Sequence, residues 1–257
     1  MRRFDTRPPT SAGSVLLLTL LLASCGGELP TGSVEVLERL PHDPEAYTQG
    51  LLFADGVLYE STGKYGESDV RRVDPATGEV LARWDLGEEH FGEGLARVGD
   101  RLLQLTWRER VAFSYDMSLA APDTVEFPGD GWGACFDGET LWTTSGGSVM
   151  FARDPETLAS TGQLQAERDG RPVFEVNELE CVGPHIYANV YQTNDLIKID
   201  TATGEVVAAW DLSALVPPEF VGAAEEVPNG IAHDPATDTF YLTGKWWPVM
   251  YRVRLVE

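Results

Sequence analysis

Val73-Asp74-Pro75-Ala76-Thr77-Gly78-Glu79-Val80 is a stretch that the chain repeats as Ile199-Asp200-Thr201-Ala202-Thr203-Gly204-Glu205-Val206. A looser copy is Arg153-Asp154-Pro155-Glu156-Thr157-Leu158, and Tyr115-Asp116-Met117 is a remnant of the same pattern. The four aspartates lie 42, 38 and 46 residues apart. This is the length of a four-stranded propeller blade, in which Asp-Pro-x-Thr-Gly would form the tight turn between the two outer strands.

A second series of short motifs recurs at a similar interval. Its five members follow one another after 44, 39, 45 and 52 residues and begin at Gln49, Glu93, Trp132, Asn177 and Asn229. Each would open the innermost strand of one blade, so the five motifs would meet at one end of the central channel. The sequence therefore predicts an all-β fold, a five-bladed β-propeller with four-stranded antiparallel blades.

The rest of the chain fits this architecture. Short alternating or apolar runs are broken by turn residues, without long helical periodicity, and residues 34–37 and 251–255 could share one blade that closes the ring. Trp84, Trp142 and Trp210 lie in outer-strand motifs and are expected in the core. With 257 residues and 43% hydrophobic content, the chain suffices for one such domain at residues 34–257. A β-sandwich, the alternative all-β architecture, would not require the repeat.

The first residues have the pattern of a bacterial lipoprotein signal peptide. Three arginines, at positions 2, 3 and 7, precede the apolar run 15–22, which is too short to span a bilayer. The sequence Leu22-Ala23-Ser24-Cys25 resembles a lipobox, in which Cys25 would be lipidated and become the mature N-terminus. We therefore expect a signal peptide at residues 1–24, a tether at 25–33 and a periplasmic protein held on a bacterial membrane by its lipid alone. Ordinary secretory cleavage that leaves Cys25 unmodified is the alternative.

The chain is strongly acidic, with 41 Asp and Glu against 19 Lys and Arg and a formal net charge of −22. Removal of residues 1–24 takes away three arginines and one aspartate, which makes the charge −24. This charge argues against a nucleic-acid partner, because phosphate contacts need clustered basic side chains. Neutral or cationic small ligands fit better, although a solvated acidic surface would also explain the charge.

Two cysteines, Cys135 and Cys181, would remain after cleavage, in a compartment that permits disulfides. Their positions in the sequence leave a disulfide and two buried free thiols equally open.

Nine stretches, in order over nearly the whole mature chain, resemble the glutamine cyclotransferase family of plants and bacteria. They include Phe91-Gly92-Glu93-Gly94-Leu95, Gly131-Trp132-Gly133 and Asn177-Glu178-Leu179-Glu180, together with residues 47–51, 58–66, 105–107, 187–192, 229–232 and 243–248. The resemblance implies an acyltransferase of the metal-independent glutaminyl-peptide cyclotransferase type, which works without a cofactor. In its substrates, peptides or proteins with N-terminal glutamine, the free α-amine attacks the side-chain carboxamide carbon and gives pyroglutamate and ammonia. A monomer is expected.

The family's active-site pattern, carried over position by position, implies catalytic roles for Glu93, Asn177 and Lys245. It implies a substrate-binding role for Gln49, Phe91, Trp107, Trp132 and Tyr191. Tyr191 stands where the family commonly has Trp, and Tyr47 where it commonly has Phe. Both changes keep an aromatic face, so we expect altered substrate fit before loss of activity.

The chemistry needs one group that takes a proton from the attacking amine and gives one to the leaving nitrogen. Glu93 is the candidate, since burial beside aromatic rings would raise its pKa toward that of an α-amine. Lys245 could stabilise the oxyanion that forms on the carboxamide, or could merely pair with Glu93 or Glu178. Asn177 and Gln49 offer amides for the substrate's polar groups, and Glu178 is expected to help bind its ammonium.

Metal sites and other functions are less well supported. The four histidines are isolated, without the spacing of a zinc site, although the sequence leaves a structural calcium ion open. The main alternative function is a non-catalytic periplasmic propeller that binds a peptide or small ligand in the same channel mouth. A second alternative is a metal-dependent hydrolase of the propeller lactonase type, with carboxylate and Asn ligands around a cation.

Overall fold

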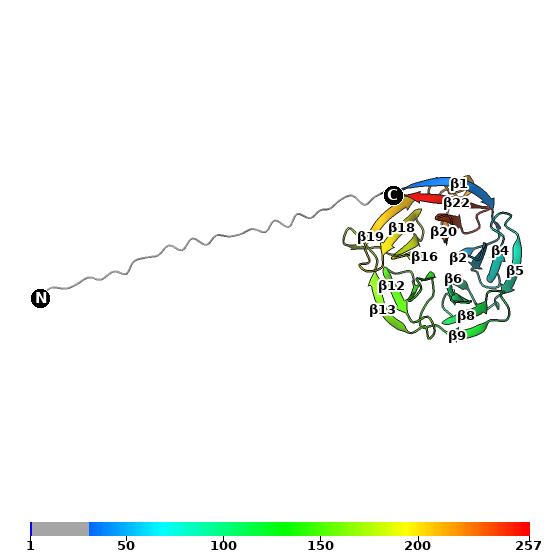
Figure 1. The fold of residues 1–257 in the computed structure, drawn as a ribbon, viewed down its shortest axis with the longest axis horizontal. Helices are drawn as coiled ribbons and strands as arrows, with labels where there is room; N and C mark the ends of the chain where they lie inside the picture. The colour runs from blue at the N-terminus through cyan, green and yellow to red at the C-terminus, as the bar shows by residue number, and fades with distance from the viewer. Residues whose placement is uncertain (2–30) are drawn as a thin grey trace.

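The fold is described here from a computed structural model, for residue 1 and residues 31–257. Residues 31–257 form five four-stranded antiparallel sheets, which Figure 1 shows arranged as blades around a common axis. The predicted five-bladed β-propeller is confirmed. The predicted signal peptide, Cys25 and the tether up to residue 30 lie outside the described residues.

Four blades are each built from consecutive strands, with the first strand next to the axis. The first blade comprises β2 (Thr48–Ala54), β3 (Val57–Thr62), β4 (Asp69–Val73) and β5 (Val80–Asp85). The second comprises β6 (Gly92–Val98), β7 (Arg101–Thr106), β8 (Val111–Asp116) and β9 (Asp123–Glu126). The third comprises β10 (Ala134–Phe136), β11 (Leu141–Thr143), β12 (Val149–Arg153) and β13 (Ser160–Gln165). The fourth comprises β16 (Val176–Val182), β17 (His185–Val190), β18 (Asp195–Asp200) and β19 (Val206–Asp211).

The fifth blade joins the two ends of the described chain and closes the ring. Strands β20 (Pro228–Asp234), β21 (Thr239–Gly244) and β22 (Val249–Val256) come from the C-terminal end, and β1 (Ser33–Pro41) completes the sheet as its outer strand. β1 runs antiparallel to β22, from the pair Ser33 and Val256 to the pair Pro41 and Val249. This confirms the expected shared blade, in which pairing of β1 with β22 joins the two ends of the described chain and closes the ring.

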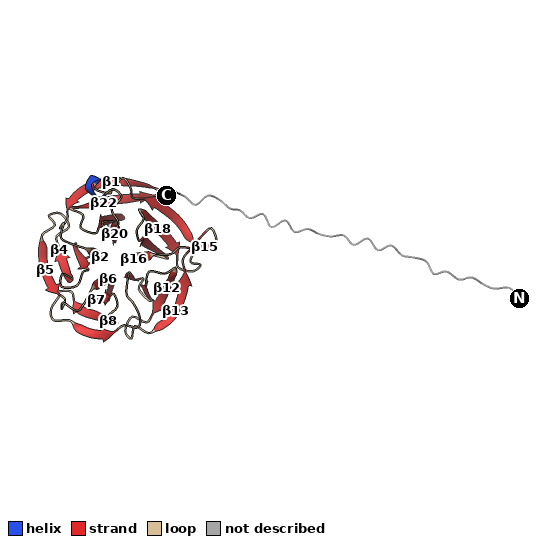
Figure 2. Cartoon of the chain, turned by 180° about the vertical axis from the view of Figure 1, so that it is seen from behind, coloured by secondary structure: helices blue, strands red, loops and turns tan. Residues whose placement is uncertain are grey.

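Two small elements lie between blades. The ribbon of β14 (Glu167–Arg168) and β15 (Arg171–Pro172) follows the third blade, and the 3-10 helix η1 (Pro218–Phe220) precedes β20. Figure 2 shows η1 in blue against strands in red. Within the described part of the chain, no helix is long and apolar enough to cross a bilayer.

The repeated aspartates form the turns that the sequence predicts between the two outer strands. Asp74 Oδ1 accepts hydrogen bonds from the backbone N–H groups of Ala76 and Thr77, between β4 and β5. Asp200 makes the same contacts between β18 and β19, and Asp154 between β12 and β13. Each carboxylate thus supplies an acceptor for backbone N–H groups that the turn would otherwise leave without a partner. This is why the aspartate motif recurs at blade spacing.

The hydrophobic core consists of clusters between neighbouring blades. Leu52, Tyr59 and Val70 of the first blade, for example, pack against Leu95 and Leu102 of the second. Corresponding clusters fill the other four interfaces of the ring within residues 31–257. Burial of these side chains between sheets is the main force holding the blades together.

The expectation that three outer-strand tryptophans are core residues holds for two of them. Trp210 is fully buried between the fourth and fifth blades, and Trp142 is buried between the third and fourth. The expectation is wrong for Trp84, which has 37% of its surface exposed. Trp84 lies on β5, the outermost strand of its blade, where much of the strand faces solvent.

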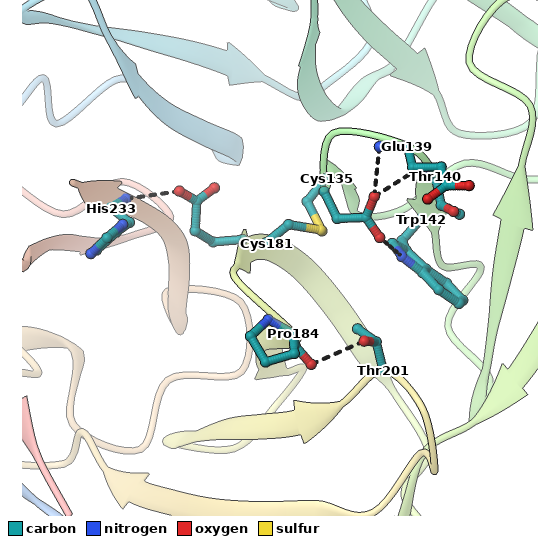
Figure 3. The surroundings of a disulfide bond; sticks show 10 residues. Cys135, Glu139, Thr140, Trp142, Cys181, Pro184, Thr201 and His233 are labelled. Carbon is teal, nitrogen blue, oxygen red and sulfur yellow. Dashed lines mark hydrogen bonds between the residues drawn. A yellow bond between two sulfur atoms is a disulfide. The ribbon is translucent and has the colours of Figure 1, made fainter.

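A disulfide joins Cys135 on β10 to Cys181 on β16, so it links the innermost strands of the third and fourth blades. Figure 3 shows the bond between these strands, close to the indole of Trp142. Of the two alternatives left open by the sequence, the structure has the bonded one, with the two Cα atoms 5.4 Å apart. The third blade has the shortest inner strand of the five, with three residues, so the bond secures the blade with the fewest ladder hydrogen bonds near the axis.

Replacing Cys135 and Cys181 together by alanine is expected to lower the free energy of unfolding by about 3–4 kcal/mol. The physical reason is that the loop closed by these cysteines, which are 46 positions apart in the sequence, is no longer closed in the unfolded chain. Urea unfolding of the double variant against the oxidised wild type measures the loss, and reduced wild type is the matched control. A loss below about 1 kcal/mol would contradict this assignment of the bond's role.

Candidate active site

A cavity of about 210 Å³ lies at one end of the central channel. Every residue that lines it comes from the same end of the blades. The lining residues are Tyr47, Gln49, Lys64, Phe91, Glu93, Trp107, Trp132, Asn177, Tyr191, Glu225 and Lys245.

The fold brings these residues together through two kinds of position. Gln49, Glu93 and Asn177 lie at the start of the innermost strands β2, β6 and β16. Trp107 and Lys245 lie just beyond the ends of the second strands β7 and β21. Because the first two strands of a blade are antiparallel, the start of one and the end of the next meet at the same end of the channel.

The innermost strands carry a β-bulge at the point where they reach the cavity. In the second blade, β6 advances by three residues from Gly92 to Leu95 while its partner strand β7 advances by two. Glu93 therefore lies in the bulge. Asn177 lies in the matching irregularity of β16, and Gln49 in that of β2. A bulge interrupts the alternation of side chains between the two faces and turns the extra residue toward a new direction, here toward the axis.

Glycines allow these strands to approach one another closely. A Cβ atom added at Gly50 would lie 2.6 Å from the backbone nitrogen of Leu95 on the next blade. Cβ atoms at Gly94 and Gly133 would likewise overlap the carbonyl oxygens of Trp132 and Asn177. Since real Cβ atoms do not come so near, glycine is required at these three contacts between inner strands around the mouth.

Burial determines the electrostatics of the cavity floor, which is formed by Gln49, Glu93, Asn177 and Lys245. Glu93 and Lys245 expose only 4% and 2% of their surfaces. Desolvation raises the pKa of the Glu93 carboxyl well above its ordinary value, and this outweighs the opposing effects of Lys245 and the Gln49 amide. Desolvation also lowers the pKa of Lys245 to about 8, against the attraction of Glu93.

Lys245 nevertheless has partners that favour its charged form. Its Nζ donates a hydrogen bond to Gln49 Oε1 at 2.6 Å. The same nitrogen lies 4.5 Å from the ring centre of Tyr47 and 4.9 Å from that of Tyr191. Aromatic faces attract a desolvated ammonium, so at neutral pH a cation is held next to Glu93.

Aromatic rings form the walls of the cavity. Phe91 packs against Trp107 at 5.5 Å between ring centres, and Trp132 against Tyr191 at 5.7 Å. The Trp132 ring rests on Gly146, where a Cβ atom would overlap it. These rings help to bury Glu93 and Lys245, and this burial is what shifts the pKa values of the two groups.

Two amides on the floor differ in their hydrogen bonding. Gln49 is already engaged by Lys245. The Oδ1 atom of Asn177 is buried and has no hydrogen-bond partner within the described residues. A buried acceptor without a partner is costly in a folded protein, so Asn177 is ready to receive a donor from a bound molecule.

Glu178 is the one predicted site residue that the structure places outside the cavity lining. Its Oε1 accepts a hydrogen bond from the backbone N–H of Leu51 at 3.3 Å, on the inner strand of the first blade. Burial raises its pKa well above the ordinary value, and the neighbouring Glu180 adds to the effect. Its side chain therefore bridges inner strands within the channel, whereas that of Asn177, one residue earlier, faces the cavity.

Comparison with known proteins agrees with this geometry. The family model for glutamine cyclotransferase matches residues 14–255. The chain belongs to the glutamine cyclotransferase family. The resemblance predicted from the sequence is confirmed, and so is the prediction of an enzyme of the glutaminyl-peptide cyclotransferase class.

Individual members of the family give the same result. Glutaminyl-peptide cyclotransferase of Arabidopsis thaliana is 37% identical over 231 residues, which are 87% of this chain and 72% of that protein. The crystal structure of Myxococcus xanthus glutaminyl cyclase superposes with a TM-score of 0.82 at 35% identity and covers 89% of this chain and 99% of that one.

Three residues that line the cavity of this chain were not among the predicted site residues: Tyr47, Lys64 and Glu225. Tyr47 and Lys64 lie inside stretches that carry the family resemblance, so their place in a motif was the available signal. Glu225 lies in the loop between η1 and β20, and nothing in its local sequence distinguishes it from other acidic loop residues.

Metal ligands are not gathered in the described part of the chain. Residues 31–257 contain no group of three or more His, Cys, Asp or Glu side chains that could hold a metal ion. His42, which is buried, instead contacts Glu60 at 2.9 Å and the carbonyl of Trp247 at 2.6 Å. It takes part in the packing between the first and fifth blades.

Proposed function

We propose that this chain converts the N-terminal glutamine of peptides or proteins into pyroglutamate and releases ammonia, with Glu93 as general acid and base. The observation that carries the proposal is the buried carboxyl of Glu93 beside Lys245, on the floor of an aromatic cavity in a member of this family. The cavity volume of about 210 Å³ is below the ~300–1,000 Å³ of sites for drug-sized ligands, which suits one residue of a peptide.

The substrate's glutamine would enter with its free α-amine and its carboxamide toward the floor. Asn177 Oδ1, which lacks a partner, would accept a hydrogen bond from one of these nitrogens. The rings of Phe91, Trp107 and Trp132 would pack around the aliphatic part of the side chain. Such a site rejects residues without the carboxamide, because its buried polar groups would then stay unpaired.

Glu93 would move one proton between two nitrogens. The α-amine nitrogen forms a bond to the carboxamide carbon, and the C–N bond to the leaving nitrogen breaks. Glu93 takes one proton from the attacking nitrogen and gives one to the leaving nitrogen, which departs as ammonia. Burial raises the pKa of the Glu93 carboxyl toward the pKa of an α-amine. The closer match reduces the free-energy cost of transferring the proton between the two groups.

Lys245 would stabilise the negative charge that develops on the carboxamide oxygen. With a pKa of about 8, it is mostly charged at neutral pH. Its contacts with Gln49 and the two tyrosine rings fix its ammonium before the substrate binds. A donor that is already in place needs no reorganisation in the transition state, which is the source of its catalytic effect.

We also propose that the protein is exported and held on a membrane by a lipid on Cys25. The support is the sequence pattern of residues 1–25, since that segment lies outside the described structure. The cavity would then act on substrates outside the cytoplasm.

Replacing Glu93 by Gln is expected to lower the rate of cyclisation about 10²–10⁴-fold, because the amide cannot exchange the proton. Incubation of a Gln-initiated peptide with the purified protein, followed by ammonia release and peptide mass, measures the rate. Wild-type protein that binds the peptide without releasing ammonia would favour the non-catalytic binding protein over the enzyme.

The matched control is Glu180→Gln, which changes another carboxyl of the channel outside the cavity. Burial raises the pKa of Glu180 to about 8, and its oxygen accepts from His233 N–H at 2.9 Å. An amide keeps this contact, so activity is expected to stay within about threefold of wild type.

In the same assay, Lys245→Met is expected to lower kcat about 10²–10³-fold. A change in KM alone would contradict the oxyanion role.

Lipidation is tested by the mass of the mature N-terminal peptide from a bacterial host that processes lipoproteins. The expected product begins at a diacylated Cys25 and is recovered with membranes, whereas Cys25→Ala releases the protein into the soluble fraction. An unmodified Cys25 in the wild-type product would contradict the anchor.

A further inference from the structure

Lys64 and Glu225 form an ion pair at the mouth of the cavity. Lys64 follows β3 in the first blade, and Glu225 precedes β20 in the fifth, 161 residues away. Lys64 Nζ donates to Glu225 Oε2 at 2.8 Å, with 29% and 49% of the two side chains exposed. Both residues line the cavity, so the pair lies between its floor and the solvent.

Lys64 is held firmly in this position. Its ammonium lies 4.0 Å from the ring centre of Tyr47 and 4.9 Å from that of Trp246. Its backbone has a φ of 91°, a conformation that residues with a Cβ atom adopt only when their surroundings require it. The lysine is therefore a fixed support for Glu225, already covered by two rings and one carboxylate.

Glu225 keeps one oxygen available. Only Oε2 contacts Lys64, and within residues 31–257 Oε1 accepts no hydrogen bond. The carboxylate is about half exposed and faces the cavity mouth. A cation that approaches the mouth can thus bind Oε1 without first breaking the pair with Lys64.

The other charged groups around the mouth are already engaged. Glu109 accepts hydrogen bonds from the hydroxyl of Tyr65 at 2.7 Å and from the backbone N–H of Phe91 at 3.4 Å. The guanidinium of Arg108 lies 3.7 Å from the ring centre of Trp107. Glu225 is therefore the carboxylate best placed for an incoming group, on a chain whose formal charge of −22 attracts cations.

We propose that Glu225, supported by Lys64, is a subsite for a basic side chain on the residue after the N-terminal glutamine. The inference rests on the proposed function, which places the glutamine at Glu93 on the cavity floor. The peptide must then leave through the mouth, where the first side chain beyond the glutamine meets the pair. A basic side chain binds Oε1 of Glu225, whereas an acidic one meets a lysine that is already occupied.

Three peptides that differ only in their second residue, Lys, Ala or Glu, test the subsite. For wild type, kcat/KM is expected to fall in the order Lys, Ala, Glu. In Glu225→Gln the ratio of Lys peptide to Glu peptide is expected to fall about threefold to fivefold, the range of a partly exposed ion pair. Lys64→Met, which leaves Glu225 unpaired, is expected to raise the ratio.

Glu226→Gln is the matched control. It removes the same charge from the next residue, which does not line the cavity. An equal fall of the ratio in both variants would show a long-range field and overturn the subsite, as would an unchanged ratio in Glu225→Gln.

Peptide affinities in the Glu93→Gln background separate the two proposals. If wild type cyclises no peptide, the proposed function fails, and binding alone decides the subsite. Tighter binding of the Lys peptide that is lost on Glu225→Gln supports it, and equal affinities for all three peptides overturn it.

Discussion

The contact of the five innermost strands around one end of the channel is the constraint on which the rest of the structure depends. Backbone atoms of neighbouring blades meet at Gly50, Gly94 and Gly133, where no side chain fits. This packing brings Gln49 and Glu93 into one cavity, although they come from different blades. The outer strands, the aspartate turns and the closure by β1 hold the five inner strands at this distance.

The same packing creates the unusual electrostatics of the site. A carboxyl and an ammonium are both removed from water, so the pKa of Glu93 rises and that of Lys245 falls. Neither shift favours folding. They persist because the five interblade clusters stabilise the ring independently of the cavity, and because aromatic rings and Gln49 compensate the buried cation. Part of this cost thus falls where proton transfer is proposed, and the buried carboxyls of Glu178 and Glu180 carry raised pKa values outside the cavity.

Much of this could be predicted from the sequence because the propeller repeats. The aspartate motif gave the blade length, and the inner-strand motifs gave the number of blades and the residues that converge. The direction of a side chain within a bulge could not be predicted in this way. Glu178 and Asn177 are neighbours in the sequence, yet one bridges inner strands and the other faces the cavity. The pairing of Lys64 with Glu225 was equally hidden, because it joins loops that approach only when the ring closes.

The central claim is that Glu93 carries a proton at a pH where an ordinary glutamic acid has lost it. Infrared spectroscopy of the carboxyl C=O stretch, as a difference between wild type and Glu93→Gln, tests this most directly. Followed over a pH titration, the protonated-carboxyl band of Glu93 is expected to disappear with a midpoint well above the pKa of about 4.3 of an ordinary Glu, and the variant is expected to lack this band. A midpoint at or below that ordinary value would contradict the claim.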